Sequence, residues 1–277
     1  MKDKYSAIWV SHSSISDYLK CPRAYYLKNV YKDPKNNHKI NIMSPSLALG
    51  QTVHKVIESI STLPVERRFE KSLLDLYEIY WQKISGEKGG FSHKDEEENI
   101  KQQGKEMIQR VINNPGPLKR KAIKIREDLP YFWLSEVDNI ILCGKIDWLE
   151  YIVESDSVKI IDFKTGKYDE DPNSLQLPIY HLLVKNSQSK NIVGVAYWYL
   201  DRDNEPIDAS LPSYQEASQR VLEIAKHIVL ARKLERFVCG RRDGCMFCHP
   251  FETILVGKAK FVGEDDFRHD LYVISHR

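Results

Sequence analysis

An aspartate and a lysine stand one residue apart at the end of an apolar run. The segment from Lys159 to Lys164 reads KIIDFK, so Asp162 and Lys164 flank Phe163. Side chains alternate across a strand, which places Asp162 and Lys164 on one face and Phe163 on the other. Asp147 lies one expected strand earlier. Two carboxylates suit magnesium or manganese, and an amine beside them can stabilise charge on a phosphate. The three residues therefore predict a metal site for phosphate ester chemistry.

The hairpin between these strands decides whether the three side chains meet. If residues 154–157 form a tight turn centred between Ser155 and Asp156, Asp147 lies opposite Lys164 and Asp162 lies diagonal to it. Opposed Cβ atoms are then about 5 Å apart and diagonal ones about 7 Å. A slip of one residue would move Asp147 to the other face. An ordinary ion pair at a strand end is the alternative, because a D-x-K match is short.

The surrounding pattern predicts the elements that would hold this site. Helices are expected over 14–28, 44–60, most of 65–113, 175–185 and 213–234. Five strand candidates are AIKIRED, YFWLSEV, IILCGKIDWLEYI, SVKIIDFK and, later, IVGVAYWYL. Helices, then a block of strands, then alternation indicate an α/β fold with a sheet flanked by helices.

Cysteines form a second group with a chemical spacing. Cys239, Cys245 and Cys248 make a C-x5-C-x2-C pattern within ten residues. In a reducing compartment this crowding favours a metal over a disulfide, and thiolates suit zinc or an iron–sulfur cluster. His249 beside Cys248 leaves a zinc Cys3His site open. Cys143, inside an apolar strand, is expected to be a small core residue.

Composition narrows the class of protein without naming a function. The chain has 277 residues, 42% hydrophobic and 29% charged, and a net charge of +2. This is typical of a globular protein and shows no global basic signature of nucleic-acid binding. No apolar run approaches the ~20 residues that cross a bilayer, and the first residues lack the apolar core of a signal peptide. We therefore expect a cytoplasmic protein that does not interact with membranes.

Five short motifs, in order along the chain, resemble those of the PD-(D/E)XK nuclease superfamily. The similarity is to its RecB-like branch, which includes the iron–sulfur exonucleases of recombination complexes and of CRISPR adaptation. The motifs are SISDYLKCPRAYYL (14–27), LGQTVHKVIE (49–58), GKID (144–147), IDFKTG (161–166) and QLPIY (176–180). They extend the resemblance over nearly the whole chain.

The resemblance implies which groups hold the metal. His54, Asp147 and Asp162 would be ligands, together with the main-chain carbonyl of Phe163. A histidine nitrogen favours manganese relative to an all-oxygen site. The alternative for His54 is a surface or core residue without a ligand role. Glu58, one turn later, is expected to be solvated or salt-bridged.

The resemblance also implies the roles of three further residues. Lys164 would be the catalytic amine, and Gln176 and Tyr180 would position it or the substrate. Their i, i+4 spacing puts Gln176 and Tyr180 on one helix face. Pro178 between them requires the helix to begin near Leu175, because proline breaks helix interiors. Taken alone, Gln176 and Tyr180 are better explained as ordinary residues of an amphipathic helix.

For the cysteines, the resemblance supplies Cys21 as a distant fourth ligand beside Cys239, Cys245 and Cys248. Family precedent then implies a 4Fe–4S cluster that joins the two ends of the chain, with zinc as the alternative. The order departs from the family, because here the isolated Cys239 precedes the close pair. That departure puts the type of cluster and the ligand set in doubt.

We therefore predict a single nuclease domain over 1–277 with a restriction-endonuclease-like mixed sheet, a helical N-terminal insertion (60–115) and a cysteine segment (236–250). The expected function is divalent-metal-dependent DNA hydrolysis, most simply by an exonuclease acting on single-stranded or end-containing DNA in recombination, repair or replication. One rival is a nucleic-acid-binding subunit that retains the fold without cutting. Another is a nuclease subunit that depends on a helicase or recombination partner protein.

Overall fold

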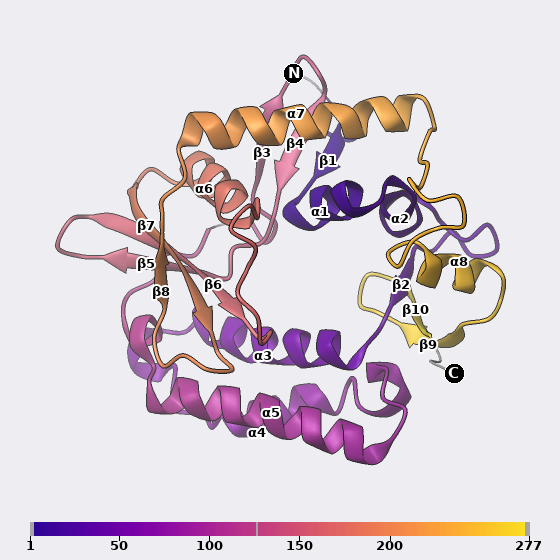
Figure 1. Ribbon diagram of the computed structural model, residues 1–277. Coiled ribbons are helices and arrows are strands. Elements are labelled where there is room, and N and C mark those ends of the chain that lie inside the picture. The colour runs from indigo at the N-terminus through magenta and orange to yellow at the C-terminus, as the bar shows by residue number, and fades with distance from the viewer. Residues whose placement is uncertain (1–2, 126, 275–277) are drawn as a thin grey trace.

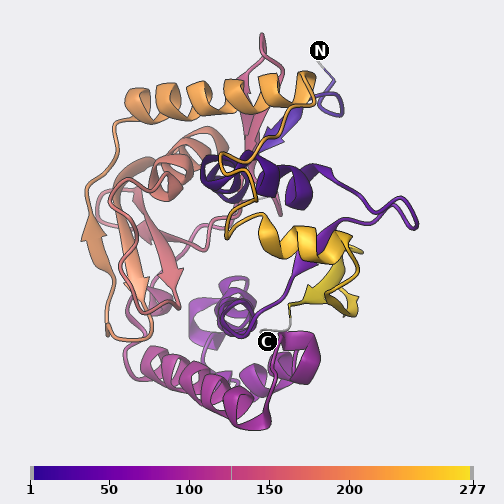
Figure 2. The same ribbon diagram turned by 45° about the vertical axis from the view of Figure 1, so that its right-hand side comes forward.

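The protein is described by a computed structural model over residues 3–125 and 127–274. Helices and three small sheets are arranged around the middle of the molecule, and the segment with α2 and β2 lies beside the C-terminal segment with α8 and β10 (Figures 1 and 2). The architecture is mixed α/β with a mixed sheet flanked by helices, as predicted. Among the described residues, no helix has the length and apolarity needed to cross a membrane.

The central sheet carries the D-x-K segment on an inner strand. Its order is β5–β6–β7–β8, with β6 antiparallel to β5 and parallel to β7, and β8 antiparallel to β7. Helix α6 makes the crossover between the two parallel strands. The bounds are β5 Trp148–Ile152, β6 Ser157–Lys164, α6 Gln176–Ser187, β7 Asn191–Tyr199 and β8 Ile207–Ala209.

The register of the β5–β6 hairpin differs from the prediction by two residues. Trp148 pairs with Ile161, so continuing the ladder by one residue places Asp147 opposite Asp162 instead of Lys164. The reason is that Ser157 belongs to strand β6 and not to the turn. A shift of two residues preserves the face of every side chain, so the expected grouping survives the error.

Two expected strands are also corrected. IILCGKIDWLEYI is not one strand, because the chain leaves one sheet after β4 (Ile140–Cys143) and enters another at β5. Gly144 begins the break, where a Cβ would lie 2.9 Å from Leu183 of α6. AIKIRED contributes only the bridge between Ala122 and Glu150, and Arg126 within it lies outside the described residues.

The sheet that contains β4 has the order β1–β4–β3, with β1 (Ile8–Val10) parallel and β3 (Tyr131–Ser135) antiparallel to β4. Its apolar side chains join a core with α6 and the long helix α7 (Tyr214–Lys233). This core supports one side of the central sheet. The helices expected over 175–185 and 213–234 are confirmed.

The opposite side of the central sheet is covered by a helical layer. Helix α3 (Pro45–Ser61) begins at the N-cap Ser44, as predicted, and lies between the sheet and the pair α4 (Leu73–Trp81) and α5 (Lys94–Asn113) (Figure 1). Short 3-10 turns occupy Val65–Arg67, Gly86–Gly89 and Gly116–Lys119. Phe163, Ile161 and Trp198 of the sheet pack into one core with these helices.

The N-terminal helix expected over 14–28 is broken at Cys21. Helix α1 (His12–Lys20) ends there, Cys21 is extended, and α2 (Pro22–Tyr25) with a π-turn (Tyr26–Val30) follows. The residue before a proline is sterically disfavoured in the helical conformation, so Pro22 explains why the helix breaks at Cys21. The Cys21 side chain consequently stands between two helices.

The two ends of the chain meet in a third sheet that sequence patterns did not indicate. Strand β2 (Ile40–Ile42) runs parallel to β10 (Asp270–Val273), which is antiparallel to β9 (Lys260–Glu264). Helix α8 (His249–Leu255) packs beside β2 in a small core with Leu27 and Ile40. These contacts join the N-terminal third of the chain to the C-terminal segment independently of the cysteines.

Candidate active site

The two aspartates meet at the end of strand β6. Asp162 is 1% exposed on that strand, and Asp147 lies in the break just before β5. The backbone amide of Phe163 donates a 3.1 Å hydrogen bond to Oδ2 of Asp147. This bond holds the Asp147 carboxylate against the strand, beside Asp162.

Helix α3 places His54 beside the two aspartates. Gly50, one turn earlier, passes close to the loop after β6, where a Cβ would lie 3.3 Å from Thr165. Nδ1 of His54 lies 3.5 Å from Oδ2 of Asp147. His54, Asp147 and Asp162 therefore converge from a helix, a loop and a strand.

Lys164 sits in a cage of polar groups. Its ammonium lies 3.1 Å from Oδ2 of Asp162 and 2.7 Å from Glu170, and it donates to the side-chain carbonyl of Gln176. It also stands over the ring of Tyr197, 5.2 Å from the centroid. These contacts point the amine at the carboxylates.

Gln176 links these groups from the first turn of α6. Its amide nitrogen donates to Oδ1 of Asp162 at 2.7 Å and lies 3.3 Å from the hydroxyl of Tyr180. Gln176 and Tyr180 are both buried, and the helix begins at Gln176, so Pro178 falls in its first turn. The geometry favours positioning of Asp162 and Lys164 by Gln176, with Tyr180 behind it.

The electrostatics of the site are those of like charges held together out of water. Burial and the neighbouring Asp147 charge raise the pKa of Asp162 to about 7. Burial would also raise the pKa of Asp147, but the hydrogen bond and charge of His54 outweigh it and lower that pKa. Burial would lower the pKa of Lys164, yet Asp162 and Glu170 raise it, so the amine stays protonated.

The donor set fits a divalent cation. Oδ2 of Asp162 is buried and accepts no well-aligned hydrogen bond, although the Lys164 ammonium lies 3.1 Å away. In a strand, the N–H and C=O of one residue point to the same edge, so the Phe163 carbonyl points to the edge where its amide meets Asp147. Two carboxylates, a carbonyl and an imidazole are hard and borderline donors suited to magnesium or manganese.

Sequence reasoning missed several groups around the site. Glu170 pairs with Lys164, and the backbone amide of Glu170 donates a hydrogen bond to the hydroxyl of Tyr199. His12 also lies near Lys164. Burial lowers the pKa of His12, and the positive charge of Lys164 lowers it further. Glu170 stands in the run Asp169–Asp171, and nothing in the sequence distinguishes which acid faces the lysine.

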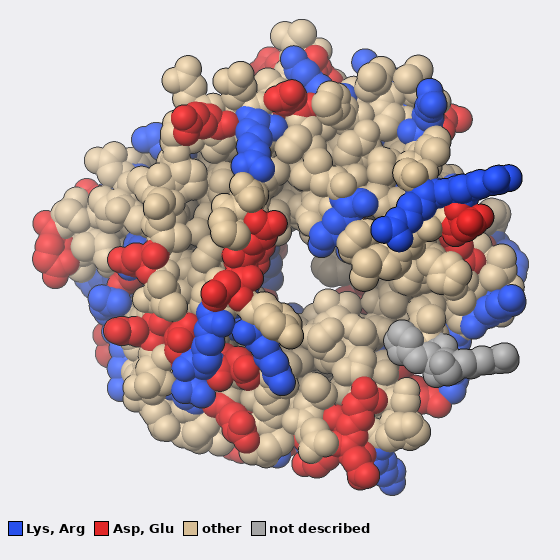
Figure 3. Space-filling view, viewed as in Figure 1, with Lys and Arg blue, Asp and Glu red and all other residues tan. Residues whose placement is uncertain are grey.

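Glu58 lies outside the pair of aspartates and forms a salt bridge, as expected from the sequence. It pairs with Lys145 at 2.5 Å on the protein surface. Both residues line a cavity of about 320 Å³ beside His54 and Asp147. A larger cavity of about 1070 Å³ begins at His54 and Glu58 and extends between α1, α3 and the C-terminal hairpin. It occupies the region in which Figure 3 shows an opening through the molecule.

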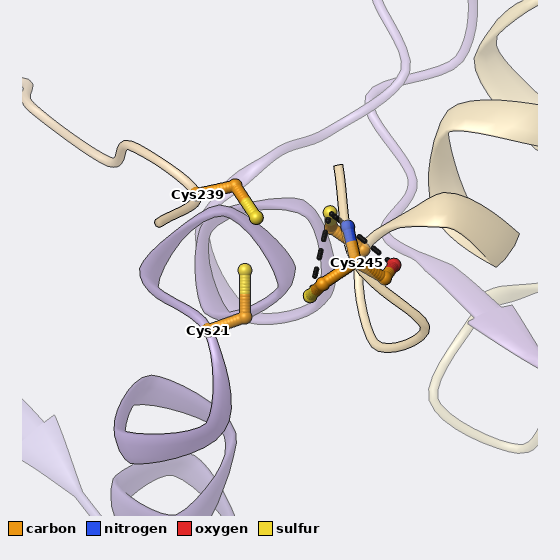
Figure 4. Close-up of side chains that lie close together, drawn as sticks. Cys21, Cys239 and Cys245 are labelled. Atoms are coloured by element: carbon orange, nitrogen blue, oxygen red, sulfur yellow. Dashed lines mark hydrogen bonds between the residues drawn. The ribbon is translucent and has the colours of Figure 1, made fainter. Parts of the chain in front are cut away.

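The four predicted cysteine ligands gather 4.8 Å or less apart, sulfur to sulfur (Figure 4). Cys21 comes from the break between α1 and α2, Cys239 and Cys245 from the loop after α7, and Cys248 from the start of α8. Segments more than 200 residues apart therefore supply one site. Cys143 is buried in β4 away from them, as expected of a core residue.

Backbone amides support thiolates in this group. The amide of Cys245 lies 3.2 Å from Sγ of Cys248, and the amide of Arg241 lies 3.5 Å from Sγ of Cys239. The amides of Cys248 and Phe247 lower the pKa of Cys245 to about 6, whereas burial raises that of Cys21 to about 12. Thiolate is the form that binds metal, so the group can hold zinc or an iron–sulfur cluster.

Two carboxylates and a lysine grouped at the end of β6 suit metal-assisted chemistry on phosphate esters. A model of the PD-(D/E)XK nuclease superfamily matches residues 9–250, and the chain belongs to that superfamily. Its substrate is accordingly a nucleic acid. No curated protein matches the chain. A solved structure described as a "putative exonuclease" from Eubacterium rectale is 14% identical, with a TM-score of 0.50 over 87% of each chain. That likeness supports the fold.

Proposed function

We propose that this protein is a divalent-metal-dependent DNA exonuclease of the RecB-like branch, acting on single-stranded or end-containing DNA in recombination, repair or replication. The observation that carries the proposal is the convergence of His54, Asp147, Asp162 and Lys164 beside the central opening. We treat the chain as one nuclease domain, with residues 60–115 as its helical insertion and 236–250 as its cysteine segment.

His54, Asp147, Asp162 and the Phe163 carbonyl would hold the metal. When bound, a magnesium or manganese ion supplies an activated water and neutralises charge on the scissile phosphate. The positive charge of the ion would favour the ionised form of Asp162, whose pKa is otherwise raised to about 7, and the Phe163 amide keeps Asp147 in place.

Lys164 contributes a fixed positive charge. As an ammonium it can orient the attacking water and stabilise the charge that develops on the phosphate. Glu170 and Gln176 hold it within reach of Asp162, so little reorganisation is needed when substrate arrives.

The central opening supports the preference for ends. His54 lines the cavity in that opening, so a strand that reaches the carboxylates through it must enter by a free end. A cavity of about 1070 Å³ is too small to enclose a double helix, whereas it has room for part of a single strand. Both points favour an exonuclease over an endonuclease, and a linear over a circular substrate.

The test is digestion of end-labelled linear single-stranded DNA and of the same sequence closed into a circle. We expect cutting of the linear strand with manganese, no cutting with a chelator, and no cutting by Lys164→Ala, although that variant still binds DNA. Lys190→Ala is the matched control, because Lys190 pairs with Asp156 on the surface and lines neither cavity.

Three outcomes would change the proposal. Equal cutting by Lys164→Ala would remove the lysine from the mechanism. Rapid cutting of the circle would replace exonuclease with endonuclease action. Binding without cutting under every metal, with activity restored by a co-purifying helicase or recombination protein, would favour a partner-dependent subunit.

For the cysteines we propose a 4Fe–4S cluster with a structural role, ligated by Cys21, Cys239, Cys245 and Cys248. The four sulfurs lie together, and they come from both ends of the chain. A brown protein with broad visible absorbance and about four irons per chain is expected. A colourless protein with one zinc per chain would replace the cluster by zinc without altering the nuclease proposal.

A further inference from the structure

Exposed apolar side chains line part of the larger cavity. Met246, Phe247 and Phe267 line it, and their exposed fractions are 76%, 39% and 81%. Large apolar side chains this exposed are costly in water, and grouped ones mark interaction surfaces. We call this group, two phenylalanine rings and the neighbouring methionine (Met246, Phe247 and Phe267), the aromatic wall. His54 lines the same cavity, so this wall faces the space that adjoins the active site.

Both phenylalanines are held in place by their surroundings. Oδ1 of Asp265 accepts hydrogen bonds of 2.9 Å from the amides of Phe267 and His269, which orders the turn between β9 and β10. The Phe267 ring stacks on His269 at 6.0 Å and 30°. Phe247 lies between the ligands Cys245 and Cys248, with the ammonium of Lys20 5.9 Å from its ring. Each ring therefore has a neighbour on one side, His269 for Phe267 and Lys20 for Phe247.

The cavity carries lysines that can contact phosphates. Among the described residues, four lining lysines have no carboxylate partner: Lys20, Lys55, Lys83 and Lys88. Two of the five lining acids pair with lysines, Asp17 with Lys28 and Glu58 with Lys145, whereas Asp265 lies beside the imidazole of His269. Glu264 lies 3.9 Å from His38. The four unpaired lysines therefore stand beside three acids without a lysine or arginine partner, Glu264, Asp265 and Asp266, so the cavity supplies cations for phosphates without being positive throughout.

We propose that the aromatic wall is a base-stacking platform for single-stranded DNA, which holds the strand while the cations contact its phosphates. This proposal rests on the proposed nuclease function and adds the surface that grips the substrate. Stacked aromatic rings with adjacent lysines are how sequence-tolerant single-strand sites are built, because every base has a π-face. Paired bases of a duplex offer no free faces, so the wall would select single strands.

The test is the affinity of metal-free protein for a fluorescent oligo(dT) and for an abasic strand with the same number of phosphates. We expect Phe247→Ala and Phe267→Ala each to weaken oligo(dT) binding about 5- to 100-fold, with little change for the abasic strand. Phe267→Trp should retain affinity, whereas Phe267→Leu should behave like the alanine variant. Tyr5→Ala removes an exposed ring outside this cavity and should change neither affinity.

Phe247 adjoins two cluster ligands, so its variant is accepted only with the metal content of the parent protein. Phe267 lies in another segment and provides the test if Phe247→Ala fails to fold. Unchanged oligo(dT) affinity in Phe267→Ala, or equal losses on both strands, would overturn the base-stacking platform even if DNA is still cut. Failure of the parent protein to cut or bind any DNA would instead overturn the nuclease proposal, and this inference with it.

Discussion

The carboxylate site and the cysteine group are both sets of ligands collected from distant segments, but they are held in different ways. Asp162 belongs to a buried inner strand, and Phe163 beside it packs into a large core. The cysteines instead lie in loops and at helix ends, and the core around them is small. The comparison teaches that core packing positions the carboxylates, whereas little packing surrounds the cysteines, so a metal bound there would have to hold them together.

The largest expected effect falls on catalysis at the carboxylate site. Asp162→Asn should lower the rate of DNA cleavage by about 1,000-fold or more, because the charge that would hold the metal is lost. The melting temperature should change by no more than about 5 °C, since the side chain is nearly isosteric and a like-charge contact with Asp147 is removed. A large fall in melting temperature would show that this site, too, depends on its charges for structure.

At the cysteine group we expect the main effect on stability instead of on the rate of cleavage. Cys21→Ser should release the metal and lower the free energy of unfolding by about 3 kcal/mol or more, with protease cleavage appearing first in the 236–250 segment. Cys143→Ala is the control, because Cys143 is buried in β4 outside the group, and it should cost about 1 kcal/mol with the metal retained. Equal protease resistance of Cys21→Ser and the parent would contradict the comparison.

A smaller effect is expected where the core positions Lys164 through Gln176. Gln176→Ala should lower kcat roughly 10- to 100-fold with little change in KM, because the amide holds both Lys164 and Asp162. Gln176→Glu should not restore activity, since it loses the amide donor and adds a third carboxylate. Gln102→Ala, on the surface of α5, is the matched control. Rescue by glutamate would mean that only the contact to Lys164 matters.

The smallest effect tests the edge of the site. Glu58→Gln should change cleavage less than about twofold and stability by less than about 1 kcal/mol, because Glu58 pairs with Lys145 at the surface. Measurement of activity against manganese concentration would reveal any contribution to metal binding. A manganese requirement that rises tenfold would make Glu58 a ligand and enlarge the carboxylate site.

Much of the site could be predicted from local patterns. The alternation of β6 places Asp162 and Lys164 on one face, and a two-residue error in the hairpin left Asp147 on that face because the period of a strand is two. The break at Cys21 was missed, although the following proline signals it. The single strand expected across residues 140–152 was wrong because periodicity does not reveal that a chain changes sheets.

The sequence by itself determined the ligand types, the strand that carries Asp162 and Lys164, and the helix that begins at Gln176, because these follow from residue chemistry and short-range periodicity. Only the tertiary structure decided that Glu170 is the acid that meets Lys164, that β2 pairs with β10, and that an aromatic wall faces the cavity that His54 lines. Those contacts join segments far apart in the chain, and their formation depends on the packing of the whole core rather than on any local pattern.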